Sequence, residues 1–390
     1  MLASVASHRP HPGQPRGPRG TVPPVSVEPG SRGAVPPVSQ KAVFCPIVTN
    51  ARRKTRTALV TAALAISAAL AVQGCGPGTA AEVTGSTHPD MTVADAQAIY
   101  QSYLTTSDSA ALAGDSVTGL ANVTNAAWEA VHAQYTALIT TGNPVTRYQY
   151  GTPTFYVPIV NNYPHWFLAV VPQRPRDASE SDSVTTLMVF SQATKTSTWA
   201  LAGSTALLPG HALPAIARDA RGYATALATY DQSVLLPPDV VGATQASLVD
   251  EGPSAEAASV FSGSPQTTGL YARQVAQRKP YAAASLDYTW QMMGADFPVF
   301  ALRTADGGGL VLYSMYLVTT IAHPLNVSGA PIPIPAATAP QIAIPGEVSK
   351  HAVYTEWTYE FATVDPPAAA SATKASVTAA TGAITFGRAY

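Results

Sequence analysis

The chain has 390 residues, with 22 Lys or Arg and 23 Asp or Glu, and a formal net charge of −1 at pH 7. Nine of the basic residues and one of the acidic residues precede Cys75, which leaves 13 basic against 22 acidic residues and a net charge of −9 after it. Nucleic-acid binding needs clustered Lys and Arg, so this balance argues against a nucleic-acid partner. The length suggests two domains.

The first 74 residues are not expected to belong to a folded domain. Residues 1–50 are rich in Pro, Gly and Ser and poor in large apolar residues, which predicts disorder. Residues 51–74 combine a basic start, an apolar run at 57–72 and small residues before Cys75, the pattern of a signal peptide too short to span a bilayer. Because such a signal belongs at an N-terminus, we expect the true start near Val48, with 1–47 a mis-called extension.

Cys75 is the predicted site of lipidation. Val72-Gln-Gly-Cys75 resembles the lipobox of bacterial lipoproteins, although Gln73 stands where a small residue is usual. The resemblance implies that Cys75 becomes the acylated first residue of the mature chain, attached to the membrane by more than one acyl chain. The alternative is an ordinary signal that leaves a free thiol. Residues 75–90 are predicted to be a flexible tether.

Residues 91–210 predict helices followed by strands. A capping-box pattern at Thr92-Val-Ala-Asp95 begins the first helix, and a second apolar stripe, which includes Trp128 and Tyr135, ends before Gly142. Strands are predicted at 146–150, 154–160, 165–171, 185–191 and 198–204.

The same order is predicted again in residues 211–390. Helices are expected at 216–230, 239–250 and 269–278, and strands at 285–292, 298–303, 310–321 and 352–364. Asp306-Gly-Gly-Gly309 predicts a hairpin turn. The last of these strands alternates, with Trp357 and Tyr359 on one face and Glu356 and Glu360 on the other, and residues 324–346 form a Pro-rich insertion.

Helices before antiparallel strands, twice, predict an α+β fold of two tandem helix-on-antiparallel-sheet units. The nearest architecture is the cystatin or ketosteroid-isomerase type, an analogy that gives no function.

Three segments carry a resemblance to a known group. They are His165-Trp-Phe-Leu-Ala-Val-Val171, Leu207-Leu-Pro-Gly-His-Ala-Leu-Pro214 and Leu302-Arg-Thr-Ala-Asp-Gly-Gly-Gly-Leu-Val311. Behind the lipobox-like signal they resemble a family of uncharacterised actinobacterial (Streptomyces-type) lipoproteins with a domain of unknown function. The resemblance covers residues 92–321. It implies export and an extracytoplasmic location at the cell envelope, and it carries over no catalytic residue.

The motifs of zinc proteases, serine hydrolases and nucleotide-binding loops are absent from the sequence, so we assign no catalytic, cofactor-binding or metal-binding residue. Glu129 and His132 lie one helical turn apart, but no second Glu-x-x-His accompanies them, and a solvated helix face is the favoured interpretation. A pocket between helices and sheet would draw its lining from acids and aromatic residues on the second set of strands: Tyr288, Trp290, Tyr313, Tyr316, Glu356 and Glu360.

The sequence therefore predicts a membrane-anchored lipoprotein, with a non-catalytic module that binds a protein, glycan or small molecule. An orphan hydrolase or isomerase, with a buried acid, His and Tyr in one pocket, is the first alternative. A structural spacer with a continuous exposed apolar patch is the second.

Overall fold

The computed structural model describes residues 91–325, 327, 329–341, 348–370 and 373–390. All of them lie in one compact unit, residues 81–390. The unit contains two large antiparallel sheets with helices, which confirms the predicted α+β class. The predicted disordered start, signal peptide, Cys75 and tether lie outside the described residues.

The first half of the unit begins with helices and continues with one sheet. The helices are α1 (Val93–Ala113), α2 (Ser116–Ala121) and α3 (Asn125–Thr141). The sheet contains β1 (Tyr148–Tyr150), β2 (Thr154–Tyr156), β3 (His165–Pro175), β4 (Val184–Gln192) and β5 (Ala200–Ala206), and a 3-10 turn, η1 (Glu180–Asp182), precedes β4. Its order is β1-β3-β4-β5, with β2 also paired to β3.

The second half repeats this arrangement. Helices α4 (Val241–Glu251) and α5 (Thr268–Ala283) precede β6 (Asp287–Gly294), β7 (Phe300–Arg303), β8 (Gly309–Ala322), β11 (Ala352–Asp365) and β12 (Ser376–Ala389). The strand order is β12-β11-β8-β6, with β7 also paired to β8. Short elements complete it: η2 (Gly252–Ser254), η3 (Glu256–Ser259), η4 (Ala339–Gln341) and a ribbon of β9 (Ile332–Pro333) with β10 (Val348–Ser349).

The two sheets share one connectivity. In each, two short strands pair in succession with the same edge of a longer strand, the first opposite its C-terminal end and the second nearer its N-terminal end. The longer strand then leads, through two more antiparallel strands, to the opposite edge. The predicted repetition of helices followed by strands is thus present in the described residues, while the boundary at residue 210 stays a prediction.

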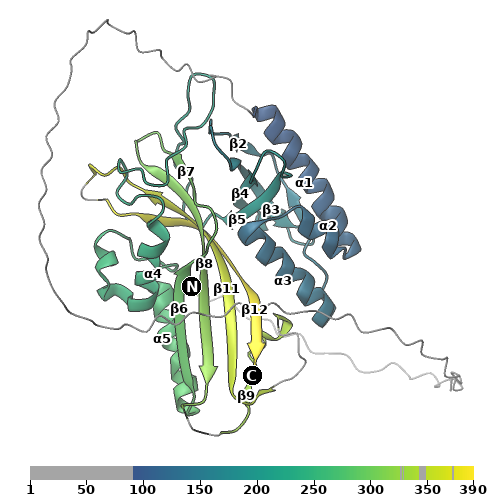
Figure 1. The fold of residues 1–390 in the computed structure, drawn as a ribbon, viewed down its shortest axis with the longest axis vertical. Helices are drawn as coiled ribbons and strands as arrows, with labels where there is room; N and C mark the ends of the chain where they lie inside the picture. The colour runs from purple at the N-terminus through teal and green to yellow at the C-terminus, as the bar shows by residue number, and fades with distance from the viewer. Residues whose placement is uncertain (1–90, 326, 328, 342–347, 371–372) are drawn as a thin grey trace, which may run out of the picture. The chain divides into compact units, whose positions relative to one another are not determined.

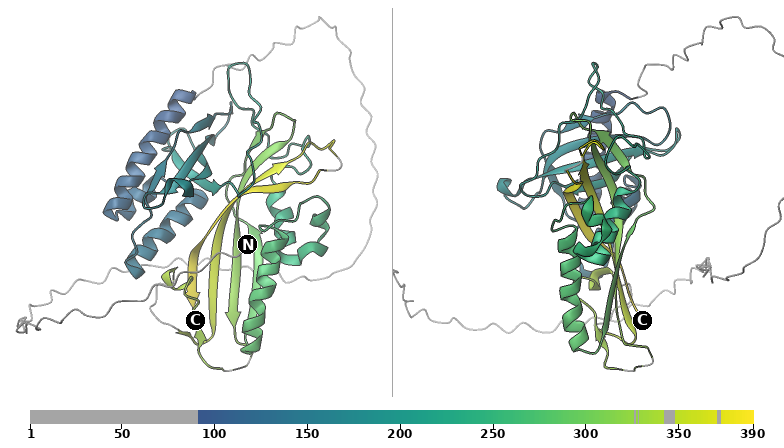
Figure 2. Two further views of the ribbon diagram at one scale, coloured as in Figure 1. Left: turned by 180° about the vertical axis from the view of Figure 1, so that it is seen from behind. Right: turned by 90° about the vertical axis from the view of Figure 1, so that its left-hand side faces the viewer.

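The first sheet lies between the helices α1 to α3 and part of the second sheet, and α4 and α5 cover the second sheet on its other side (Figures 1 and 2). Phe167 belongs to the cluster of buried residues that includes Tyr100 of α1. The next residue, Leu168, belongs to a different cluster with Leu302 and Leu310 of the second sheet. Burial on both faces explains why the β3 sequence is continuously apolar rather than alternating.

Local signals set several boundaries. The Thr92 side chain accepts from the Asp95 amide at 3.2 Å, and the Asp95 carboxylate accepts from the Thr92 amide at 2.9 Å, which confirms the capping box. Gly142 ends α3 at φ 75°. The predicted hairpin between β7 and β8 is also present, with Gly307 at φ 90°.

The predicted helix at 216–230 is wrong. This segment is extended and makes single bridges to Thr304 and Leu302 at the edge of the second sheet. The Asp219 carboxylate accepts from the amide of Tyr223, and Gly222 has φ 89°, so a tight turn replaces helical hydrogen bonding there. The sequence patterns also missed α2 and β12, and β5 begins two residues later than predicted.

Replacing Leu168, which is 0% exposed, by Ala should destabilise the protein by about 2–5 kcal/mol, because it leaves a cavity between the two sheets. Leu112→Ala is the matched control, since Leu112 is 67% exposed on α1, and it should change the stability by less than about 0.5 kcal/mol. Urea unfolding measures both. Equal losses of stability in the two variants would contradict the burial of β3 against the second sheet.

Candidate functional site

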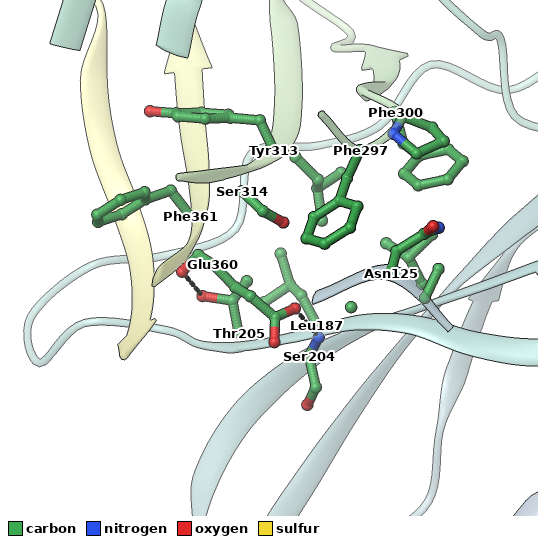
Figure 3. Close-up of a pocket in the computed structure, with 15 residues that line it drawn as sticks. Asn125, Leu187, Ser204, Thr205, Phe297, Phe300, Tyr313, Ser314, Glu360 and Phe361 are labelled. Carbon is green, nitrogen blue, oxygen red and sulfur yellow. Dashed lines mark hydrogen bonds between the residues drawn. The ribbon is translucent and has the colours of Figure 1, made fainter. Parts of the chain in front are cut away.

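Glu360 on β11 is a buried acid at the junction of the two sheets. The predicted alternation is correct, since Glu360 lies on the face opposite to Tyr359, but at Glu360 that face does not meet water because β5 covers it. The side chain is 7% exposed. Its Oε2 accepts a hydrogen bond from the Ser204 amide, and its main-chain oxygen accepts from the Thr205 hydroxyl at 2.8 Å (Figure 3). Glu360 is therefore shielded from water although it lies on the more polar face of its strand.

Gly203 provides the space for this contact. A Cβ atom at Gly203 would lie 2.6 Å from Glu360 Oε2, so a larger residue would displace the carboxyl. Beside the carboxyl is a cavity of about 20 Å³, lined in part by Phe297 and Phe300 (Figure 3). Such a volume holds about one water molecule.

Burial raises the pKa of Glu360 to about 8, and the hydrogen bond from the Ser204 amide lowers it only in part. No basic side chain contributes to this pKa. Glu360 is therefore mostly protonated at pH 7, which makes it a neutral hydrogen-bonding group that can still ionise near physiological pH.

Glu360 also lines a larger cavity, of about 140 Å³, between the helices α1 to α3 and the first sheet. Four tyrosines contribute to its wall: Tyr103, Tyr135, Tyr148 and Tyr150. Burial raises the pKa of each hydroxyl, that of Tyr103 to about 12. A buried acid and tyrosines thus converge here, but no histidine is among the residues that line this cavity, and only part of the cluster expected of an enzyme is present.

A third cavity, of about 280 Å³, is a groove between α5 and the second sheet, named here the α5 groove. Trp357 and Tyr359, two residues apart on β11, form its aromatic floor, with ring centroids 5.9 Å apart and an angle of 18° between the planes. Tyr281 of α5 stacks on Tyr288 of β6 at 5.3 Å, and the Tyr288 hydroxyl donates to Gln274 Oε1 at 2.6 Å. Its volume is just below the range of about 300–1,000 Å³ typical of small-molecule sites.

The helix side of the α5 groove is basic. Arg273 and Gln277 are exposed at its edge, and Arg273 makes no ion pair within the part of the chain that the structure describes. Burial raises the pKa of the Tyr359 hydroxyl and Arg273 lowers it in part, so the positive charge of Arg273 acts on the groove floor. α5 contains Arg273, Arg278 and Lys279 and no acidic residue, in contrast to the net charge of −9 after Cys75.

The structure divides the six predicted pocket residues among several environments. Tyr288 lines the α5 groove, and Tyr313 and Glu360 line the cavity between the sheets. Trp290 packs under the Arg278 guanidinium at 4.5 Å and donates to the Val249 carbonyl. The remaining two, Tyr316 and Glu356, lie near Glu129 of α3, and burial with these two carboxylates raises the pKa of Tyr316 to about 12.

Glu129 and His132 are both half-buried, so the helix face that they share is only partly open to solvent. Burial and the nearby Glu356 raise its pKa, and His132, which stacks on Trp128 at 4.7 Å, lowers it in part. No group of three metal-ligating side chains occurs within the described ranges. None of the described helices combines the length and hydropathy that a membrane span needs.

Sequence patterns missed most residues of both larger cavities. The sequence predicts Tyr135 on an apolar helix stripe and Tyr148 and Tyr150 on a strand, but it gives no sign that these residues and Tyr103 line one cavity. The basic residues of α5 are visible in the sequence, and Trp357 and Tyr359 were placed on one strand face. Their proximity to α5 depends on tertiary packing.

Comparison with protein families shows which family the chain belongs to. The model of a family described as a domain of unknown function (DUF8094) matches residues 87–387, and the chain belongs to this family. No curated protein matches the sequence.

Replacing Glu360 by Gln should remove a pH dependence of stability. The folded-state pKa of about 8 lies above the ordinary value of 4.5, so the stabilising contribution of the protonated carboxyl is complete below about pH 4.5 and is lost as the pH rises to 8. The loss amounts to at most about 1.4 kcal/mol per pH unit. Gln can still accept from the Ser204 amide.

Urea unfolding at pH 5, 6, 7 and 8 measures this effect. The free energy of unfolding of E360Q, minus that of the wild type, should increase with pH. Asp365, whose pKa burial raises to about 7, contributes to both proteins and cancels in the difference. Parallel pH curves for the two proteins would show that Glu360 does not titrate as described.

Proposed function

We propose that this member of the DUF8094 family is an exported, lipid-anchored binding protein that holds an acidic glycan in the α5 groove. The observation that carries the proposal is the aromatic floor of Trp357 and Tyr359 next to the guanidinium of Arg273, which has no ion-pair partner among the described residues. The proposal treats the protein as a binding module without a catalytic step.

The floor of the groove fits flat rings. Trp357 and Tyr359 are both half-buried, so part of each ring remains open to a ligand. Small-molecule sites are typically lined by aromatic side chains with a few polar groups that orient the ligand. The apolar face of a sugar ring can pack on such a floor while its hydroxyls stay at the edge.

Polar groups for those hydroxyls surround the floor. The Thr338 and Thr355 hydroxyls lie 3.1 Å apart at one side, and the Gln277 amide is exposed at the other. Gln274 uses its oxygen to accept from Tyr288, so its amide nitrogen remains to donate. These groups favour a hydroxylated ligand over a purely apolar one.

The charge of the groove favours an acidic ligand. A guanidinium with no carboxylate partner can form two parallel hydrogen bonds to a carboxylate of a ligand. The acidic remainder of the exported chain repels anions, so the basic α5 would also direct an acidic glycan to the groove.

The lipid anchor is supported by sequence alone. The basic start, the apolar run and the lipobox-like Val72-Gln-Gly-Cys75 favour acylation at Cys75, which would hold the binding unit on the outer face of the membrane through residues 75–90.

Tetragalacturonate should quench tryptophan fluorescence saturably, and Trp357→Ala should weaken its binding at least tenfold because the stacking floor is lost. Trp128→Ala, a change of the same size on α3, is the control and should leave the affinity unchanged. Arg273→Gln should weaken tetragalacturonate but not the neutral maltotetraose. No saturable binding of either sugar to the wild type would refute the glycan proposal.

Cys75→Ala should release the protein from the membrane fraction of the expressing cells and remove the added lipid mass. The intact mass of the wild type should give a mature chain that begins at Cys75. Cys45→Ala is the matched control, because Cys45 precedes the signal and should affect neither mass nor fractionation. A soluble, unmodified wild-type product would rule out the anchor.

A further inference from the structure

The cavity under α1 to α3 contains a carboxyl group with one oxygen unused. Oε2 of Glu360 accepts from the Ser204 amide, but Oε1 accepts no hydrogen bond from the residues that the structure describes. The residue is 7% exposed and lines the 140 Å³ cavity. This oxygen is therefore available to a molecule that enters the cavity.

The cavity offers this carboxyl no positive partner. None of the residues that line it is a Lys, Arg or His, and Glu360 is the acid among them. Four tyrosines line the same cavity, and the Tyr103 hydroxyl is close enough to Glu360 for their charges to interact. Aromatic rings attract cations through their negative faces, and a buried carboxylate is stabilised by a paired positive charge.

We propose that this cavity is a second binding site, for a small organic cation, in which the Glu360 carboxylate supplies the opposite charge and the tyrosine rings form the wall. The site is separate from the α5 groove and does not depend on the glycan proposal. Its walls come from α1, α2, α3, the first sheet and β11.

The volume limits the ligand. A cavity of about 150 Å³ accommodates benzene, so 140 Å³ admits an ammonium ion with a body of about that size. Tetramethylammonium fits this limit, has no hydrogen to donate and cannot lose its charge. It therefore tests the charge and the aromatic wall without the complication of a titrating ligand.

Binding should increase with pH. The Glu360 pKa of about 8 means that the empty site is mostly protonated at pH 7, and a cation that binds the carboxylate must displace the proton. The affinity should rise by up to about tenfold per pH unit between pH 6 and 8 and then level off, with nearly one proton released per cation at pH 7.

Other groups around the carboxyl do not titrate in that range. Those that line the two cavities are tyrosines whose pKa values are raised by burial: Tyr103 of α1, Tyr135 of α3, Tyr148 and Tyr150 of β1, and Tyr313 of β8. Asp108 and Asp115, next to Tyr150 and Tyr135, have lowered pKa values because of hydrogen bonds, so both stay ionised. The polar side chains that β5 and β12 contribute are Ser204, Thr205 and Thr381, none of which titrates.

Isothermal titration of the full chain with tetramethylammonium, at pH 6, 7 and 8 in two buffers of different ionisation enthalpy, measures affinity and proton release together. Neutral tert-butanol, which has the same branched shape, should bind at least tenfold more weakly at pH 8. Glu360→Gln should abolish the pH dependence and reduce cation affinity at pH 8 at least tenfold. Glu356→Gln, on the same strand outside the cavity, should leave the affinity unchanged.

The proposal is overturned if tetramethylammonium does not bind saturably, if tert-butanol binds equally well, or if binding releases no proton. The wild-type proton release decides the question even if E360Q fails to fold. Trp357→Ala, which removes the floor of the α5 groove, should leave cation binding intact, so failure of one proposed site is distinguishable from failure of the other.

Discussion

The outer edge of β5 is the constraint on which the arrangement of the two sheets depends. An edge strand exposes amides that need acceptors, and here side chains of the second sheet provide them: Glu360 accepts from Ser204, and the Thr381 hydroxyl accepts from the Ala206 amide at 2.9 Å. Two residues further along, the main chains meet directly, and the Leu208 amide donates to the Thr378 carbonyl at 2.9 Å. Side chains of the second sheet therefore bond to β5 at Ser204 and Ala206, whereas the main chains bond to each other directly at Leu208.

The shared connectivity of the two sheets places the cavity under α1 to α3 and the α5 groove next to corresponding strands. β1 and β6 are the first short strands of their sheets. Tyr148 and Tyr150 of β1 line the cavity under the helices, and Tyr288 of β6 lines the α5 groove. The two cavities differ in the charged residues that line them. The first cavity contains the carboxyl of Glu360 and no basic residue, whereas the α5 groove has Arg273 at its edge and no acidic residue in its lining. A repeated architecture thus contains two cavities that differ in their charged groups, one with an ionisable acid and one with an arginine.

Sequence patterns predicted the features that depend on neighbouring residues. The capping box at Thr92, the turn at Gly307 and the alternation of β11 all follow from local chemistry, and all three are present. Features that depend on distant contacts were missed. β12 is rich in Ala, Gly and Thr, which give a weak strand signal, and it is held by pairing with β11 along most of its length. The segment at 216–230 has helical spacing but pairs at a sheet edge instead. Glu360 could be placed on a strand face, but not under β5.

The choice of Glu at position 360 is not explained by the junction alone. Glutamine would accept from the Ser204 amide equally well, would occupy nearly the same volume beside Gly203, and would avoid the free-energy cost of a buried ionisable group. What only the acid provides is a group that can change charge near neutral pH inside a cavity lined by aromatic rings. A structural bridge needs one oxygen, and Glu360 leaves a second oxygen without a protein partner among the described residues. The unused oxygen and the ionisable proton together favour a ligand-related role for Glu360 over a structural one.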